Sequence, residues 1–265
     1  MKNFKSYFYT AFIKSQVWVS LCIAFLVLYI QEIHHLHVPH IVWLVFFSTL
    51  LAYNMAYWVV DYKSDERLAV MLLSGILSIY LFFQLNSILA QVLILLAGCV
   101  SIFYSLPIYQ SSLRQIPQIK IILIALVWST AVNITLIESS LLYLDEFIWS
   151  FVAIFLFVIG ITIPFDIRDY HIDNKSLKTI PQQYGINKSK IIAGVLLIIS
   201  VYFLQLSVHD QYTNYIMIYV LTVFIAIFMI YRQKPHSNLW YTSFWIEGIS
   251  ALPFLIFKIL SYIIS

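Results

Sequence analysis

Charged residues are scarce in this sequence of 265 residues. Only 10% of the residues are charged, whereas 62% are hydrophobic and 17% are aromatic. Soluble domains carry roughly 25% charged and about 45–50% apolar residues. The charges are too few to cover a soluble globule of 31.0 kDa, and the mean hydropathy of +0.90 agrees. A soluble fold is therefore excluded, and lipid is the solvent that the surface has to face.

Cysteines and cleavage signals are also scarce. Cys22 and Cys99 both lie inside apolar runs, where a thiol behaves as a small hydrophobe, which argues against disulfide chemistry. Three lysines precede the apolar residues 17–30, but no small-residue cleavage site follows them, so we expect a retained first helix. The net charge of +3 does not indicate nucleic-acid binding.

What the chain has instead is nine long apolar runs. They are continuously apolar for about 20 residues instead of alternating over about 10, so they predict transmembrane helices rather than barrel strands. We expect an all-α, multi-span transmembrane bundle of nine helices, forming a single domain over residues 1–265 with no room for a soluble domain. The predicted spans are residues 16–32, 41–60, 68–85, 88–107, 120–137, 144–165, 190–207, 212–231 and 240–263.

The basic residues predict the orientation. If the N-terminus is cytoplasmic, all of the 15 Lys and Arg residues except Lys258 fall on the cytoplasmic side, which is the positive-inside pattern. The connections 61–67, 108–119 and 166–189 on that side are the longer ones, so we expect function there. We expect a multi-pass protein of the bacterial inner membrane, with its N-terminus and active-site loops in the cytoplasm.

A first group of polar residues stands at the end of the second predicted span. At about 100° per residue, Asn54, Asp61 and Asp65 lie within about 40° of one another on a helix. They form one polar stripe that points away from lipid, or they mark the membrane boundary.

A second group follows the sixth predicted span. Asp166, Asp169 and Asp173 are spaced i, i+3, i+7, which places three like charges on one helical face. Helix stability does not favour that arrangement, but a divalent cation removes the repulsion, and Mg²⁺ is bound through one or two carboxylates plus substrate phosphates. The alternative is a solvated loop with incidental acids.

The two groups are four spans apart, so both emerge on the same face and would form a mouth for a metal-bound anion. Basic residues between the acids can complement phosphate oxygens, with forked contacts for Arg and as point charges for Lys, or can simply mark the membrane interface. These residues are Lys63, Arg67, Arg114, Lys120, Arg168, Lys175 and Lys178.

At these residues the sequence resembles the UbiA superfamily of intramembrane aromatic prenyltransferases, whose members are nine-helix bundles. The run from Asp166 to Asp173, with Lys175, Lys178 and Gly185 behind it, resembles the second aspartate motif of that family. The segment from Tyr104-Ser-Leu-Pro107 through Arg114 and Lys120 to Trp128 resembles the connection between the fourth and fifth helices. Glu247-Gly248 resembles an Asp-Gly pair in the last span.

The resemblance implies transfer of an isoprenoid chain from a prenyl diphosphate to an aromatic or other lipid-soluble acceptor within the lipid bilayer, with Mg²⁺ as the cofactor. The catalytic, metal-binding carboxylates would be Asp61, Asp65, Asp166, Asp169 and Asp173. The substrate-binding residues would be Asn54, Tyr104, Arg114, Lys120, Arg168, Lys175 and Lys178. Aromatic rings that could stabilise an allylic cation are those of Tyr53, Tyr57, Trp58, Tyr104, Trp128 and Tyr170.

Two positions depart from the family pattern. Tyr57 stands where the first motif usually has Asn, so Asn54, one turn earlier, would have to substitute for it. Ile108 stands where many members have a Lys that contacts diphosphate, and that role would fall to Arg114 or Lys120. A degenerate, inactive homologue therefore stays open. A transporter is a further alternative, although it would need ionisable residues near mid-membrane, and these acids cluster at one face.

Two other features invite a functional interpretation. Glu247 lies inside the ninth predicted span, about 10 Å from its start at Trp240. An ionisable residue there indicates a functional site, with a structural hydrogen bond as the alternative. The histidines at 34, 35, 37 and 40 have a spacing that fits no common closed metal site, so we expect a polar turn at the membrane interface.

Overall fold

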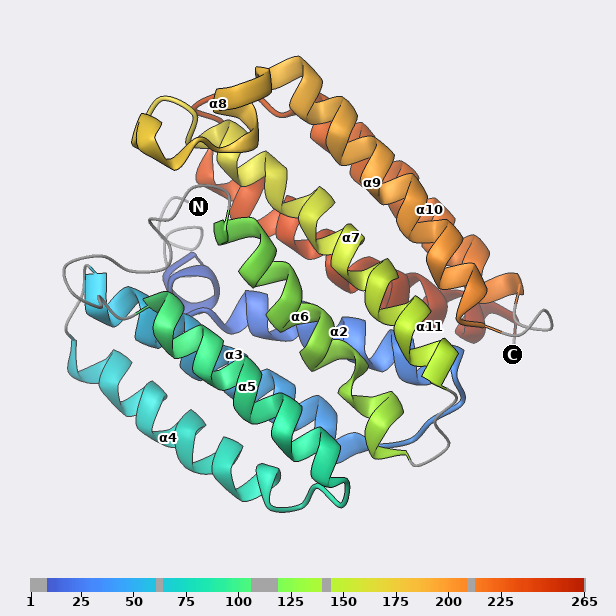
Figure 1. Cartoon of the computed structure of the whole chain (residues 1–265). Helices are drawn as coiled ribbons and strands as arrows, with labels where there is room; N and C mark the ends of the chain where they lie inside the picture. Colours follow the sequence, from blue (N-terminus) through green and yellow to red (C-terminus); the bar gives the residue numbers. More distant parts are fainter. Residues whose placement is uncertain (1–8, 61–63, 106–118, 140–143, 209–212, 265) are drawn as a thin grey trace.

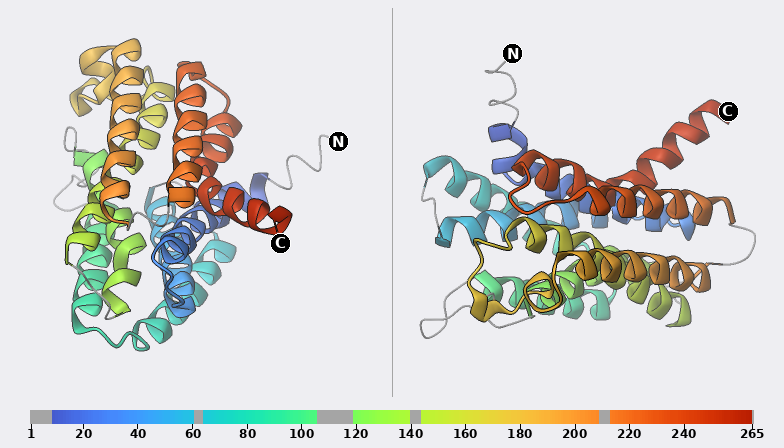
Figure 2. Two further views of the ribbon diagram at one scale, coloured as in Figure 1. Left: turned by 90° about the vertical axis from the view of Figure 1, so that its right-hand side faces the viewer. Right: turned by 90° about the horizontal axis from the view of Figure 1, so that it is seen from above.

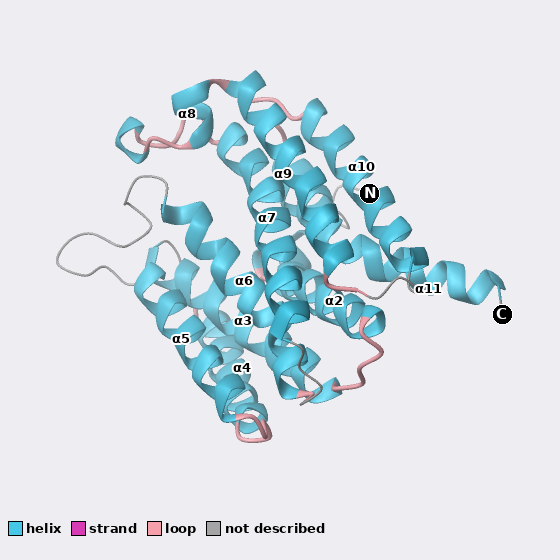
Figure 3. Cartoon of the chain, turned by 45° about the vertical axis from the view of Figure 1, so that its right-hand side comes forward, coloured by secondary structure: helices cyan, strands magenta, loops and turns pink. Residues whose placement is uncertain are grey.

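The computed structural model describes residues 9–60, 64–105, 119–139, 144–208 and 213–264, and these form helices and connecting turns without a strand (Figures 1 and 3). The nine predicted helices are all present within these ranges, and most ends agree to within about four residues. The long elements are α2 Val17–Ile33, α3 Pro39–Val60, α4 Asp65–Phe82, α5 Ile88–Ser105, α6 Ile119–Glu138, α7 Leu144–Arg168, α9 Ile186–Leu206, α10 Thr213–Arg232 and a last segment that ends in α11 Leu252–Ile264. The short elements are η1 Tyr9–Lys14, η3 Lys175–Leu177 and α8 Ile180–Tyr184.

Six of the described helices are long and apolar enough to cross a membrane, so the protein is an integral membrane protein. These candidate spans are Pro39–Trp58, Ile119–Glu138, Leu144–Arg168, Ile186–Leu206, Asn214–Arg232 and Tyr241–Ile263. The remaining three predicted spans are weaker. Val17–Ile33 and Ile88–Tyr104 are apolar but shorter. α4 begins with Asp65 and Glu66, which suit the positive end of a helix dipole but reduce its apolar length.

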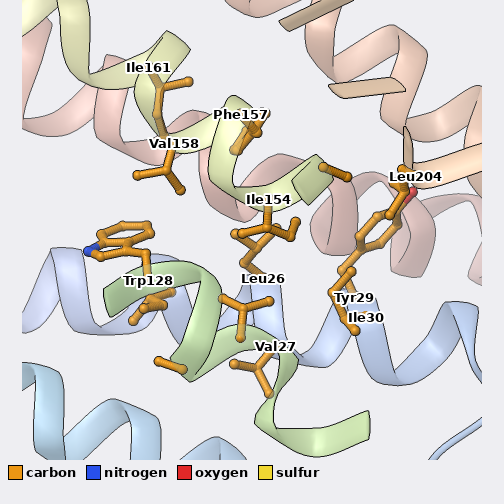
Figure 4. Close-up of a cluster of buried hydrophobic side chains, with 14 of the residues drawn as sticks. Leu26, Val27, Tyr29, Ile30, Trp128, Ile154, Phe157, Val158, Ile161 and Leu204 are labelled. Atoms are coloured by element: carbon orange, nitrogen blue, oxygen red, sulfur yellow. The ribbon is translucent and has the colours of Figure 1, made fainter. Parts of the chain in front are cut away.

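The helices pack around α2, α6 and α7 (Figure 1). α2 contacts α3, α6 and the last segment, α7 lies between α6 and α9, and α10 contacts both α9 and the last segment (Figures 1 and 2). The centre of the bundle is filled by Leu26, Val27 and Ile30 of α2, which meet Ile154 and Phe157 of α7 (Figure 4). The core is therefore apolar along most of its length.

One glycine allows the close approach of α7 and α9. A Cβ atom on Gly160 would lie 2.8 Å from Leu197 Cγ and 3.3 Å from the carbonyl oxygen of Ala193. Small residues let membrane helices pack backbone against backbone, where dispersion contacts hold them together. Gly160 thus allows the close approach of two helices whose ends carry the connection 166–189.

The last segment is irregular at its start. It begins with a π-helical turn, η5 Tyr241–Ile246, and continues through a 3-10 turn, η6 Ile249–Ala251, into α11. Trp18 of α2 holds the π turn in place, because its Nε1 donates to the carbonyl oxygen of Phe244 at 3.0 Å and its ring stacks on Phe244 at 4.5 Å. π-helical turns are rare and are frequently found at functional sites.

The polar stripe predicted for residues 54, 61 and 65 is wrong, because the helix is not continuous there. α3 ends at Val60 and α4 begins at Asp65, after Ser64, which has an extended backbone (φ −124°, ψ 145°) and accepts a hydrogen bond from Arg67 N. Ser64 is thus an N-cap that starts a new helix. Asp61 and Lys63 lie outside the described residues.

Candidate active site

The last turn of α7 carries a buried carboxylate, Asp166, which is 1% exposed. A buried charge has to be paired, and Lys120 in the first turn of α6 supplies the partner, with 2.9 Å between its Nζ and Asp166 Oδ1. Both residues were predicted for the site, in different roles. Their ion pair joins the start of α6 to the end of α7.

The second carboxylate, Asp169, is held by its neighbour Arg168. Arg168 Nε donates to Asp169 Oδ1 at 2.8 Å and Arg168 Nη2 donates to Asp169 Oδ2 at 2.7 Å, so the pair is a two-bond fork. The third guanidinium nitrogen, Nη1, donates to Thr242 Oγ1 at 2.8 Å. The backbone oxygen of Arg168 accepts from His236 N at 3.2 Å. Arg168 therefore connects the end of α7 to the loop and the π turn that begin the last segment.

The third carboxylate, Asp173, lies beyond the end of α7. Its backbone N donates to the carbonyl oxygen of Asp169 at 2.8 Å, so a turn brings it back towards the end of the helix. Its Oδ2 is buried and has no hydrogen-bond partner among the described residues. Asp166 feels the charges of both Asp169 and Asp173, and Lys120 also interacts with Asp173. The three acids act on one another electrostatically, but only Asp166 lies within regular helix, so the single helical face that their spacing predicts is not formed.

Aromatic residues line the bundle below these charges. Tyr104 of α5 interacts electrostatically with Lys120 and with Tyr53 of α3. Trp128 of α6 lies deeper and donates from Nε1 to Tyr53 Oη at 3.3 Å. Tyr57, one turn after Tyr53, has the guanidinium of Arg67 5.4 Å from its ring centroid. Four helices thus contribute aromatic or basic groups to the same end of the bundle.

The other predicted site residues are outside this network of described hydrogen bonds and ion pairs. Asn54 is buried and donates from Nδ2 to the carbonyl oxygens of Ser15 and Leu50, both at 2.9 Å, so its amide nitrogen holds the N-terminal segment against α3. Asp65 is exposed in the first turn of α4, and Lys175 and Lys178 are exposed around η3. Arg114 lies outside the described residues, as does Asp61.

Sequence reasoning missed Thr242. It is fully buried, and its only functional signal is the bond to Arg168, which joins residues 74 positions apart. No local pattern predicts that contact, because threonine inside an apolar run is ordinary. The pairing of Lys120 with Asp166 was missed for the same reason.

The donor chemistry of this end of the bundle fits Mg²⁺. Hard cations take carboxylate oxygens, and Asp173 Oδ2 is a buried oxygen with no other described partner. In the described ranges, no three Asp, Glu, His or Cys side chains are close enough together to enclose a metal ion by themselves. A site here would have to be completed by a substrate phosphate or by a residue outside those ranges.

Comparisons with known proteins bear on the fold. No protein-family model matches the sequence, and no curated protein is similar to it. Solved structures do match. A UbiA homologue from Archaeoglobus fulgidus bound to Cd²⁺ superposes with a TM-score of 0.66 at 17% identity, covering 96% of this chain and 99% of that one. The same homologue bound to DMAPP and Mg²⁺ gives 0.64, with the same identity and coverage.

A third match is a structure of digeranylgeranylglyceryl phosphate synthase in membranes, with a TM-score of 0.57, 15% identity and 98% coverage of both chains. The three matches define a class of protein: a membrane-embedded helical bundle of the UbiA type. This chain has the UbiA fold over nearly its whole length, so the predicted resemblance is confirmed at the level of the fold.

Proposed function

We propose that this protein is a UbiA-type prenyltransferase, a single domain that moves an isoprenoid chain from a prenyl diphosphate to a lipid-soluble acceptor with the help of Mg²⁺. The observation that carries the proposal is the group of Asp166, Asp169 and Asp173 with Lys120 and Arg168 at one end of an apolar bundle. A homologue with the same fold has been solved with DMAPP and Mg²⁺, which supports this class of donor.

The polar end and the apolar interior suit the two halves of the donor. A diphosphate carries negative charge and suits the basic groups Lys120, Lys175 and Lys178, whereas an isoprenoid tail suits the apolar core between α2, α6 and α7. Tyr53, Tyr104 and Trp128 lie at the boundary, where their ring faces would stabilise a developing allylic cation.

The acids would hold the cofactor. Asp166, Asp169 and Asp173, together with the first-motif acids Asp61 and Asp65, would bind Mg²⁺, which when bound neutralises the departing diphosphate. Lys120 and Arg168 keep Asp166 and Asp169 in fixed orientations before any ligand arrives. The orientation that fits the positive-inside pattern puts this end and the N-terminus in the cytoplasm, in the bacterial inner membrane.

The test is Mg²⁺-dependent binding and transfer. Calorimetric titration of detergent-solubilised protein with DMAPP, with and without Mg²⁺, should give binding only with the metal. Radiolabelled DMAPP and extracted membrane lipids should then yield a labelled lipid. Asp173→Asn should lower donor affinity at least tenfold, because it removes a carboxylate from the metal site, while Asp145→Asn, at the opposite end of α7, should not change it. Absence of metal-dependent binding in the unmodified protein would favour an inactive homologue.

A further inference from the structure

Glu247 lies at the irregular junction of the last segment. It follows the π turn Tyr241–Ile246 and precedes the 3-10 turn Ile249–Ala251, inside the candidate span Tyr241–Ile263. The junction is fixed by Trp18, since a Cβ atom on Gly248 would lie only 3.0 Å from Trp18 Cζ2. Polar groups at membrane depth are costly and are retained mostly for function. A carboxylate held at this depth by specific packing therefore needs an explanation.

A second intramembrane carboxylate shows what a structural role looks like. Glu138, at the end of α6, accepts from Asn86 N at 2.6 Å, from Asn86 Nδ2 at 2.9 Å and from Ser87 N at 3.1 Å. Its oxygens are thus used to hold the turn before α5. The carboxylate of Glu247 makes no hydrogen bond or ion pair with the described residues, and the side chain is partly exposed. The carboxylate oxygens of Glu247 therefore remain available as hydrogen-bond acceptors.

The groups that face Glu247 come from three helices. Arg168 of α7, Tyr53 of α3 and Cys22 of α2 all interact electrostatically with it. Arg168 is a positive charge that acts on Glu247, and it is also the residue that holds Asp169. Ser250, one turn after Glu247, donates from its Oγ to the carbonyl oxygen of Glu247 at 2.7 Å. Glu247 therefore lies among groups of three other helices, and Arg168 links it to the carboxylate group at the end of α7.

Glu247 also lies at a defined depth. It is six residues beyond the start of the π turn, Tyr53 is seven residues before the end of α3, and Trp128 is nine residues after the start of α6. At 1.5 Å per residue, these positions are roughly 9 to 14 Å inside the bundle. Lys120 and Asp166 lie within two residues of their helix ends. The polar layer of Glu247, Tyr53 and Trp128 is thus the next one below the charges at the mouth.

We propose that Glu247 is the catalytic base of the transfer reaction and that the acceptor is a lipid-soluble hydroxyl compound, an inference that rests on the proposed function. The acceptor oxygen forms a bond to C1 of the isoprenoid as the bond from C1 to the diphosphate oxygen breaks. The bonding electrons leave with the diphosphate, and the acceptor hydroxyl proton passes to Glu247. The acceptor would lie between Glu247 and the Tyr53–Trp128 pair, directly below the diphosphate.

The first measurement separates donor binding from proton transfer. Calorimetry with DMAPP and Mg²⁺ should give dissociation constants within twofold for the unmodified protein, Glu247→Gln and the exposed control Glu32→Gln. Transfer of radiolabelled DMAPP to two probes, 1-naphthol and dodecanol, should fall at least 100-fold in Glu247→Gln, the range expected for a lost general base. Glu247→Asp should keep part of the activity. The rate should rise with pH in the unmodified protein and lose that dependence in Glu247→Gln.

The second measurement needs no acceptor. N,N′-Dicyclohexylcarbodiimide modifies carboxyl groups in apolar surroundings, and peptide mass spectrometry should find Glu247 labelled. DMAPP with Mg²⁺ should slow that labelling at least tenfold, and DMAPP alone should not.

The outcomes are distinct. Wild-type transfer rates in Glu247→Gln, or labelling of Glu247 that is not slowed although calorimetry detects the donor, overturn the role of Glu247. If neither probe is prenylated, the role of Glu247 is judged from the carbodiimide labelling: slower labelling with DMAPP and Mg²⁺ supports it, and unchanged labelling overturns it. Loss of donor binding in Glu247→Gln would assign Glu247 to the donor site and would refute its role as the catalytic base. No Mg²⁺-dependent binding in the unmodified protein refutes the proposed function itself, and the role of Glu247 falls with it.

Discussion

The ion pair between Lys120 and Asp166 gives a quantitative test of the site. The Asp166 side chain is 1% exposed and that of Lys120 18%, so water screens the pair weakly. Lys120→Met keeps the length of the side chain but leaves a buried carboxylate without its cation. Breaking a buried pair from one side costs about 3–5 kcal/mol, since the remaining charge keeps its desolvation penalty. By the usual scaling of stability with melting temperature, the midpoint of thermal unfolding should fall by roughly 10 °C.

The assay is thermal unfolding of the protein in detergent, compared across a mutant cycle. Lys258→Met is the matched control, because Lys258 pairs with Glu32 in an ion pair that is 51% and 31% exposed. Surface pairs contribute about 0–1 kcal/mol, so this variant should melt within roughly 2 °C of the unmodified protein. Lys120→Met combined with Asp166→Leu should recover most of the loss, because no charge then remains buried. Equal, small shifts for Lys120→Met and Lys258→Met would refute the buried pair.

Three further predictions concern packing, positioning and the metal. Gly160→Ala should destabilise the protein by about 1–3 kcal/mol in thermal unfolding, because the added Cβ overlaps Leu197 across the α7–α9 contact, whereas Gly98→Ala has nothing within 4 Å and should be neutral or stabilising. If both substitutions behave alike, the close approach is wrong. Thr242→Val should raise the Mg²⁺ concentration needed for DMAPP binding severalfold, while Thr242→Ser should not, since only the hydroxyl accepts from Arg168; equal effects would remove Arg168 from the positioning role. Chelation of Mg²⁺ should abolish DMAPP binding but leave the melting temperature unchanged within about 1 °C, and a large fall in melting temperature would show that the metal is needed for folding.

The helices were predictable because each apolar run is long and uninterrupted. A span such as residues 144–165 has to be helical in lipid whatever its neighbours do, and α7 indeed begins at Leu144. Helix ends were less predictable where the polar residues at a boundary could either continue a helical face or begin a new helix. The prediction that Asn54 and Asp65 share one helical face assumed a continuous helix, but Ser64 caps a new helix. Serine favours N-cap positions, so a helix start directly after Ser64 agrees with the preference of that residue type.

The site was predictable only where its residues are close in sequence. The run from Asp166 to Asp173 is local, so its spacing predicts three neighbouring carboxylates, although the helix that would align them ends at Arg168. Asn54 was different, since its amide is used by Ser15 in an N-terminal segment that folds back against α3. That contact depends on how the whole bundle packs. The same holds for Thr242, whose role depends on a partner from another helix.

The way in which the acids are neutralised distinguishes this site from the one that the sequence suggests. From spacing alone, three like charges on one face require a cation, and a divalent metal is the simplest candidate. In the structure, Lys120 offsets Asp166 and Arg168 offsets Asp169, so two of the three charges are balanced by residues of the chain itself. Asp173 keeps a buried oxygen without a described partner. The charges of Asp166 and Asp169 are thus offset before any ligand binds. A metal ion that binds with a diphosphate would therefore meet carboxylates that are already oriented. Such preorganised groups are the condition for strong electrostatic stabilisation of a leaving group.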